Sequence, residues 1–129
     1  MNHDLILTDR AADRLATATG LLRDEGYIIR ATPAGDIASD AVLDTIEETV
    51  REWGPLGVVV HAAGISPAMS DWKTIISVNA IGTTILLDRM ERLLGPEMVV
   101  VLIRSMAGHV APPDTAIDAL LDAPLQSGL

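Results

Sequence analysis

The sequence contains no cysteine and no phenylalanine, and its only aromatic residues are two tryptophans and one tyrosine. Without cysteine no disulfide can form, which is compatible with the cytoplasmic location that we expect. Hydrophobic residues still make up 49% of the 129 residues, so a core must be built from valine, isoleucine, leucine and alanine. This composition suits a parallel sheet covered by closely packed helices. The length predicts a single domain over residues 1–129.

Positive charge is also scarce, with 9 Lys and Arg against 18 Asp and Glu and a net charge of −9. The cations are scattered, so we expect neither nucleic acid nor an anionic membrane surface as a partner. The longest unbroken apolar run, residues 98–103, is far shorter than the roughly 20 residues of a membrane helix. With three histidines and no cysteine, a metal site is not expected.

Four short segments are expected to form strands: residues 5–8, a segment that begins with residues 27–29 and ends near Pro33, residues 58–60 and residues 98–103. The last two are apolar without alternation, which predicts strands that are covered on both faces. Segments with helical periodicity separate the four strands. Strands that alternate with helices predict an α/β fold with a doubly wound, Rossmann-like parallel sheet.

Three helices are expected between these strands. The first ends at Gly26, the second is capped by Asp40 and ends at Gly54, and the third spans residues 70–94. Residues 106–129 are expected to form an irregular tail with a helical turn at most. The positions expected to be buried, spaced three or four residues apart, are Leu15, Ala18, Leu22, Val42, Ile46, Val50 and Trp53.

Small and polar residues follow the expected strands, where open parallel sheets bind ligands. The segment 72–83 carries the most specific pattern, Val-Asn-x-x-Gly-Thr. It places Asn79 and Gly82 inside an expected helix, although both residue types have a low helix propensity. In order and spacing, these motifs resemble the short-chain dehydrogenase/reductase family over about residues 4–110. The residues that carry the resemblance are Asp9, Asp36, Ile37, His61, Ala62, Ala63, Gly64, Asn79 and Ser105.

The resemblance implies an NAD(P)-dependent oxidoreductase that transfers a hydride between the cofactor and an alcohol or ketone. It implies that Asp9 binds the adenosine ribose and favours NAD over NADP, although Arg10 opposes this preference and Asp9 can also simply cap the next helix. Asp36 and Ile37 would contact the adenine. The run His61, Ala62, Ala63 and Gly64 would pass close to the cofactor, with His61 in place of the family's usual Asn and Gly64 in a conformation that side chains forbid.

The same resemblance implies catalytic roles for two residues. Asn79 would support a proton-relay water, and Ser105 would hydrogen-bond the substrate oxygen. From the residues alone, Asn79 can equally be a satisfied core side chain and Ser105 an ordinary loop residue. His109, close to Ser105 in the sequence, is not expected to act as a substitute acid.

Two motifs of the family are absent from this sequence. None of the ten glycines forms Gly-x-Gly-x-x-Gly or the family's looser Gly-rich turn, and the Tyr-x-x-x-Lys pair is missing, since the only Tyr and Lys are Tyr27 and Lys73. We therefore expect a partial Rossmann-like domain that lacks the first strand and the C-terminal strands and helices. Cofactor binding is expected to be weak or absent, and turnover is not expected.

The missing first strand would lie between the strands at 5–8 and 58–60, which would leave two inner edges unpaired. The two strand pairs can close up, another chain can fill the gap, or the sheet can stay split. An alternative to an enzyme is a non-catalytic partner module that associates with itself or with a full-length relative. Its expected contact surface is the helix at 70–94, with Ile75, Leu86, Met90 and Leu93 available for packing.

Overall fold

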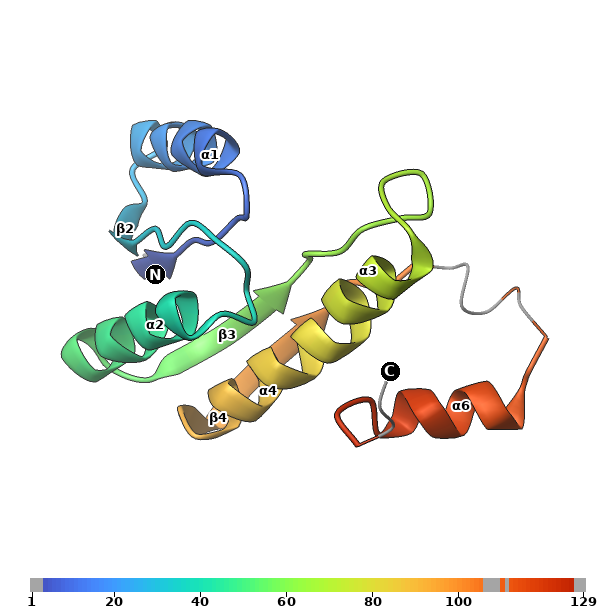
Figure 1. The fold of residues 1–129 in the computed structure, drawn as a ribbon. Helices are drawn as coiled ribbons and strands as arrows, with labels where there is room; N and C mark the ends of the chain where they lie inside the picture. The colour runs from blue at the N-terminus through green and yellow to red at the C-terminus, as the bar shows by residue number, and fades with distance from the viewer. Residues whose placement is uncertain (1–3, 106–109, 111, 127–129) are drawn as a thin grey trace.

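The computed structural model describes residues 4–105, 110 and 112–126. Within them, four strands form two separate parallel pairs. β1 (Asp4–Ile6) pairs with β2 (Ile28–Ala31), and β3 (Leu56–His61) pairs with β4 (Leu94–Leu102). Figure 1 shows these strands in the spatial order β2, β1, β3, β4, so that β1 and β3 are the inner strands. Of the three outcomes expected for the missing strand, the structure therefore shows the split sheet.

Helices connect the strands and lie against them (Figure 1). α1 (Ala12–Asp24) connects β1 to β2, and α2 (Asp40–Trp53) connects β2 to β3. The expected third helix is a continuous series of α3 (Trp72–Ile76), the π-helical segment η1 (Ser77–Gly82) and α4 (Thr83–Glu91). No helix within the described residues is long and apolar enough to cross a membrane.

The helix ends differ in detail from the expectation. Ser39, rather than Asp40, caps α2, because its hydroxyl accepts a hydrogen bond from the Val42 amide. The third helix ends at Glu91, and Gly95 lies inside β4, so glycine and proline do not stop this helix. The extra residues bulge out of the ladder, since β3 advances from Leu56 to Val58 while β4 advances from Leu94 to Val99.

The core forms where α2 and α4 meet the strands. α2 contributes four buried residues and α4 contributes two, and partly buried side chains from β1, β3 and the loop after β2 pack around them. Leu43, which the predicted stripe omitted, is the most deeply buried of the six at 0% exposed. The buried residues are Val42, Leu43, Ile46, Val50, Leu86 and Met90.

Two of the residues expected on buried helix stripes are exposed. Trp53 ends α2 and is 53% exposed, and its ring instead lies under the Arg30 guanidinium at 3.6 Å. In α1, Thr19 is buried beside Leu15, whereas Ala18 is exposed. Thr19 satisfies its hydroxyl by donating to the Leu15 carbonyl at 2.7 Å, which allows a polar residue to take this position.

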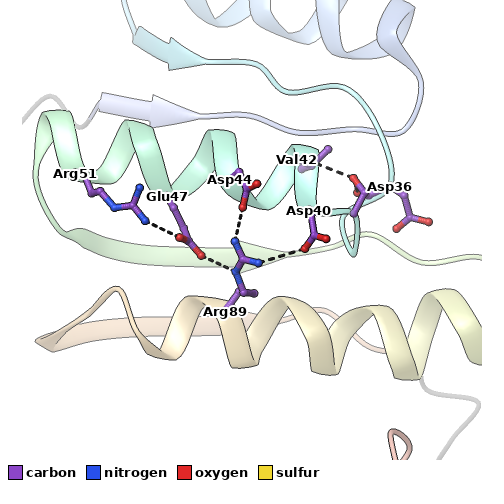
Figure 2. A network of polar contacts seen from close by, with 8 residues as sticks. Asp36, Asp40, Val42, Asp44, Glu47, Arg51 and Arg89 are labelled. Atoms are coloured by element: carbon purple, nitrogen blue, oxygen red, sulfur yellow. Dashed lines mark hydrogen bonds and ion pairs between the residues drawn. The ribbon is translucent and has the colours of Figure 1, made fainter.

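A polar cluster joins α2 to α4 (Figure 2). The Arg89 guanidinium on α4 donates hydrogen bonds to Asp40, Asp44 and Glu47, which occupy successive turns of α2. The bonds to Asp44 and Glu47 raise the pKa of Arg89. Glu47 also accepts from Arg51 on its own helix. The cluster fixes the two helices over the core from its solvent side.

The opposite face of the β3–β4 pair is uncovered, so the expectation of strands buried on both faces is wrong. Val58 and Val60 are 55% and 63% exposed, and Ile103, just after β4, is 61% exposed. The reason is that no helix of the described residues packs against this face, while α2 and α4 both lie on the other one. The tail is more regular than expected, because α6 (Thr115–Asp122) forms a helix.

Candidate functional site

A cavity of about 590 Å³ opens between the two strand pairs. Ile6 and Thr8 line it from the side of β1, and residues 58–60 line it from the side of β3. Its mouth is formed by the loops that follow β1, β2 and β3, which is where parallel sheets bind ligands. All seven residues that the sequence assigned to cofactor binding line this one cavity: Asp9, Asp36, Ile37, His61, Ala62, Ala63 and Gly64.

Asp9 holds the turn between β1 and α1. Its Oδ1 atom accepts hydrogen bonds from the Ala11 amide at 2.7 Å and from Arg14 at 3.2 Å. Among the described residues, the other carboxylate oxygen has no hydrogen-bond partner. Asp9 thus supports the start of α1, as the simpler interpretation held, and retains an acceptor for a ligand hydroxyl. Arg10 and Arg14 line the same cavity, so two cations stand beside this carboxylate.

Asp36 organises the next loop in a similar way. Its Oδ1 atom accepts from the Ala38 amide at 2.9 Å, and its carbonyl accepts from both the amide and the hydroxyl of Ser39. Ser39 in turn caps α2, so the loop carrying Asp36 and Ile37 is tied to a well-packed helix. Gly35 takes φ 149°, and a Cβ there would lie 3.0 Å from Val42 Cγ2, which accounts for glycine at this turn.

His61 ends β3 beneath α4 and is 7% exposed. Its Nε2 atom lies 2.9 Å from the Thr83 hydroxyl, which itself donates to the Asn79 carbonyl at 2.8 Å. Because a hydroxyl has one proton to donate, His61 Nε2 carries a proton and donates to Thr83. Burial lowers the pKa of His61, in keeping with this neutral form. His61 is therefore a structural hydrogen-bond donor that anchors the strand end to the helix.

Asn79 clamps the loop that follows β3. Its side-chain amide accepts from the Ile65 nitrogen at 2.9 Å and donates to the Ile65 oxygen at 2.8 Å. Gly64, next to Ile65, has no positive φ, so the expectation of a conformation forbidden to side chains is wrong. A Cβ at this position would lie 3.3 Å from Asn79 Oδ1, so a larger residue would press on the Asn79 side chain. The close approach of Asn79, rather than backbone strain, is thus what favours glycine at position 64.

The π-helical segment η1 explains the unusual pair of Asn79 and Gly82 in one helix. Gly82 is buried, and a Cβ on it would lie 3.3 Å from the Ser77 carbonyl and 3.8 Å from Ala38 Cβ. π-Helical turns within α-helices are frequent at functional sites. Here the turn brings the Asn79 side chain to the cavity loop and its carbonyl to Thr83. The motif thus has a structural role, which the sequence had left open beside the catalytic one.

The two expected catalytic residues do not join the seven around the cavity. Ser105 lies exposed beyond the end of β4, and Asn79 hydrogen-bonds Ile65 of the cavity loop without lining the cavity itself. His109 lies outside the described residues. Arg14, which pairs with Asp9, was not predicted from the sequence. Its position in the first turn of the helix that follows Asp9 could have indicated this pair. It also missed that Thr83, the last residue of the Val-Asn-x-x-Gly-Thr pattern, binds His61.

Comparison with known proteins settles the family. The model of a family described as enoyl-(acyl carrier protein) reductase matches residues 1–123. This chain belongs to the short-chain dehydrogenase/reductases. A short-chain dehydrogenase/reductase of Alternaria brassicicola is 28% identical over 111 residues, which are 86% of this chain and 40% of that protein.

Solved structures of the family share the fold. A short-chain dehydrogenase/reductase from Brucella melitensis, described as a glucose/ribitol dehydrogenase, is 28% identical with a TM-score of 0.70. The match covers 84% of this chain and 48% of that one. A gluconate 5-dehydrogenase from Burkholderia cenocepacia, solved with NADP and tartrate, is 23% identical with a TM-score of 0.65, over 93% and 51% of the two chains. The chain thus spans about half the length of these solved relatives, with a partial Rossmann-like fold.

Proposed function

We propose that this chain forms the adenosine-binding part of a nicotinamide-dinucleotide site in an oxidoreductase acting on alcohols or ketones. The observation that carries the proposal is the single cavity lined by all seven predicted cofactor residues. Its volume of about 590 Å³ lies within the range of small-molecule sites. The bound cofactor would supply hydride transfer, and the residues of this chain would hold and orient its adenosine end.

The donor and acceptor groups at the mouth fit an adenosine. Asp9 presents a carboxylate oxygen that has no partner among the described residues, which suits a ribose hydroxyl. Ile37 supplies an apolar surface beside Asp36 for the purine ring, and the small run 62–64 allows a close approach of the backbone. The clamp from Asn79 to Ile65 holds this run in place, so Asn79 acts as a positioning residue.

We infer a preference for NAD over NADP, because the Asp9 carboxylate repels a 2′-phosphate. Arg14 already pairs with Asp9, which leaves Arg10 as the cation that would oppose this preference. Binding should be weak and turnover absent in the chain as given, because its sequence has neither the Gly-rich turn nor the Tyr-x-x-x-Lys pair.

Titration calorimetry with separate pieces of the cofactor tests the proposal. AMP and NAD should bind with similar dissociation constants, because both carry the adenosine end, and nicotinamide mononucleotide should not bind. Asp9→Asn should weaken AMP binding about tenfold, equivalent to roughly 1.4 kcal/mol. Arg14→Gln is the matched control, because it removes the ion pair while leaving the carboxylate.

Two results would contradict the proposal. Equal binding of AMP and nicotinamide mononucleotide would place the recognition elsewhere than at the adenosine end. NAD-dependent oxidation of an alcohol by the purified chain would refute the expected lack of turnover. Tighter binding of NADP than of NAD would overturn only the inferred preference and would assign the 2′-phosphate to Arg10.

A further inference from the structure

The polar side chains that line the cavity are unevenly divided between its two sides. On the side of β1 and β2, the segment 8–36 contributes five of them: Thr8, Asp9, Arg10, Arg14 and Asp36. The other side is formed by β3, the loop after it and the helices packed against it. There, His61 is the only polar side chain among the described lining residues. A ligand that spans the cavity therefore meets several charged groups on one side and a single imidazole on the other.

His61 uses one of its two ring nitrogens inside the protein. Its Nε2 atom donates to the Thr83 hydroxyl at 2.9 Å, whereas Nδ1 has no hydrogen-bond partner among the described residues. In the same part of the chain, no side-chain nitrogen or oxygen is fully enclosed without such a partner, so Nδ1 is accessible from outside the protein. Because His61 is only 7% exposed and lines the cavity, this access is through the cavity.

The bond to Thr83 decides which role Nδ1 can play. With the proton on Nε2, the Nδ1 atom of a neutral imidazole carries a lone pair and accepts hydrogen bonds. Burial lowers the pKa of His61, which keeps the ring neutral at pH 7. A ligand that covers Nδ1 without donating to it would leave a buried acceptor unpaired, which costs binding free energy. Nδ1 therefore favours ligands that present an O–H or N–H group to this side of the cavity.

We propose that His61 determines ligand specificity in the cofactor site, because its Nδ1 atom accepts a hydrogen bond from the adenosine. This proposal rests on the proposed function and extends it from the mouth to the β3 side of the cavity. The resemblance to the family implies only that residues 61–64 pass close to the cofactor, whereas the imidazole adds a side-chain acceptor across the cavity from Asp9. Adenosine has two kinds of donor, the ribose hydroxyls and the adenine amino group, and both offer the same chemistry to Nδ1.

Nucleotide titrations of the full chain, followed by NMR, test the proposal. His61→Gln places an amide nitrogen near the position of Nε2 and carbon near that of Nδ1, so it keeps a donor for Thr83 and loses the acceptor. AMP should bind this variant about tenfold more weakly than the parent. Thr83→Val is the matched control, because it removes the structural bond and leaves the His61 ring, and it should lose clearly less affinity. In the parent, the resonance of the unprotonated Nδ1 nitrogen should move when AMP binds, which a purely structural imidazole would not show.

Analogues of AMP that each lack one donor identify the group that pairs with His61. They are 2′-deoxy-AMP, 3′-deoxy-AMP and purine riboside monophosphate, which lacks the amino group. The analogue without the paired donor should bind the parent and His61→Gln equally, whereas the other analogues should keep the ratio found for AMP.

The outcomes separate a ligand contact from a structural role. Equal binding of AMP to the parent and to His61→Gln, or a ratio that every analogue keeps, would overturn the proposal. A loss in Thr83→Val as large as that in His61→Gln would leave His61 only its structural role and would overturn the proposal as well. If the parent binds no AMP, the proposed function itself fails, whereas AMP binding that is indifferent to His61→Gln overturns this proposal alone.

Discussion

The two faces of the β3–β4 pair differ in burial, most clearly along β3. On the face under α2 and α4, His61 of β3 is 7% exposed, and Leu43 and Met90 of the two covering helices are 0% and 2% exposed. On the other face, Val60 is 63% exposed and Ile103, just beyond β4, is 61% exposed. Apolar composition therefore predicts which side chains gain free energy from burial, while burial itself requires a second layer of polypeptide. The covered face adjoins the core, whereas the uncovered face remains an exposed aliphatic surface.

The largest effect should follow from truncating a side chain in the core that α2 and α4 form over the covered face. Leu43→Ala should lower the free energy of unfolding by roughly 2–5 kcal/mol, because it removes buried methyl groups and leaves a cavity. Val60→Ala is the matched change on the uncovered face and should stay within about 0.5 kcal/mol of the parent. Urea denaturation followed by circular dichroism measures both. A loss at Val60 as large as that at Leu43 would mean that the second face is covered in solution.

The next effect contrasts two helical glycines. Gly82→Ala places a Cβ against the Ser77 carbonyl, which belongs to the backbone and cannot turn away, so we expect a loss of about 1–3 kcal/mol. Gly20→Ala in α1 meets nothing within 4 Å and should stabilise the protein by up to about 1 kcal/mol through helix propensity. Thermal unfolding of the two variants should shift in opposite directions. A gain at Gly82 would show that η1 can relax into an ordinary α-helix.

The smallest effect concerns His61, at the boundary between β3 and α4. Burial holds its pKa in the folded state below 6.5, so the unfolded chain binds more protons in the window just below pH 6.5. The free energy of unfolding should therefore fall as the pH drops through this window and level off above it. His61→Gln should flatten this part of the profile. An unchanged slope in the variant would assign the pH dependence to another group.

Much of the site was predictable because its residues directly follow the strands that the sequence predicts. Each expected strand was found within a few residues, and the loops after three of them converge on one cavity. The convergence of Asp9, Asp36 and residues 61–64 follows from parallel topology alone, since parallel strands present their carboxyl ends at one edge. The order of motifs also identified the family, which the comparisons confirm.

Side-chain roles were predicted less well, because they depend on neighbours from distant segments. Trp53 fell on the correct helical stripe but lies past the end of the core, where Arg30 from β2 covers its ring. Leu86 and Met90 were expected to be available to another chain, yet they complete the core of this one. Ile75 and Leu93 stay partly exposed, so association through residues 70–94 remains a prediction that lacks half of its expected surface.

By itself, the sequence determined the alternation of strands and helices, the parallel topology and the set of residues at the cavity mouth. These features depend on local periodicity and on the geometric rule that connects strands through helices. Tertiary structure alone decided that the strands form two pairs, that one face is uncovered and that Asn79 lies close to Gly64. The physical reason is that pairing, burial and close approach are properties of two segments brought together in space, and neither segment encodes them alone.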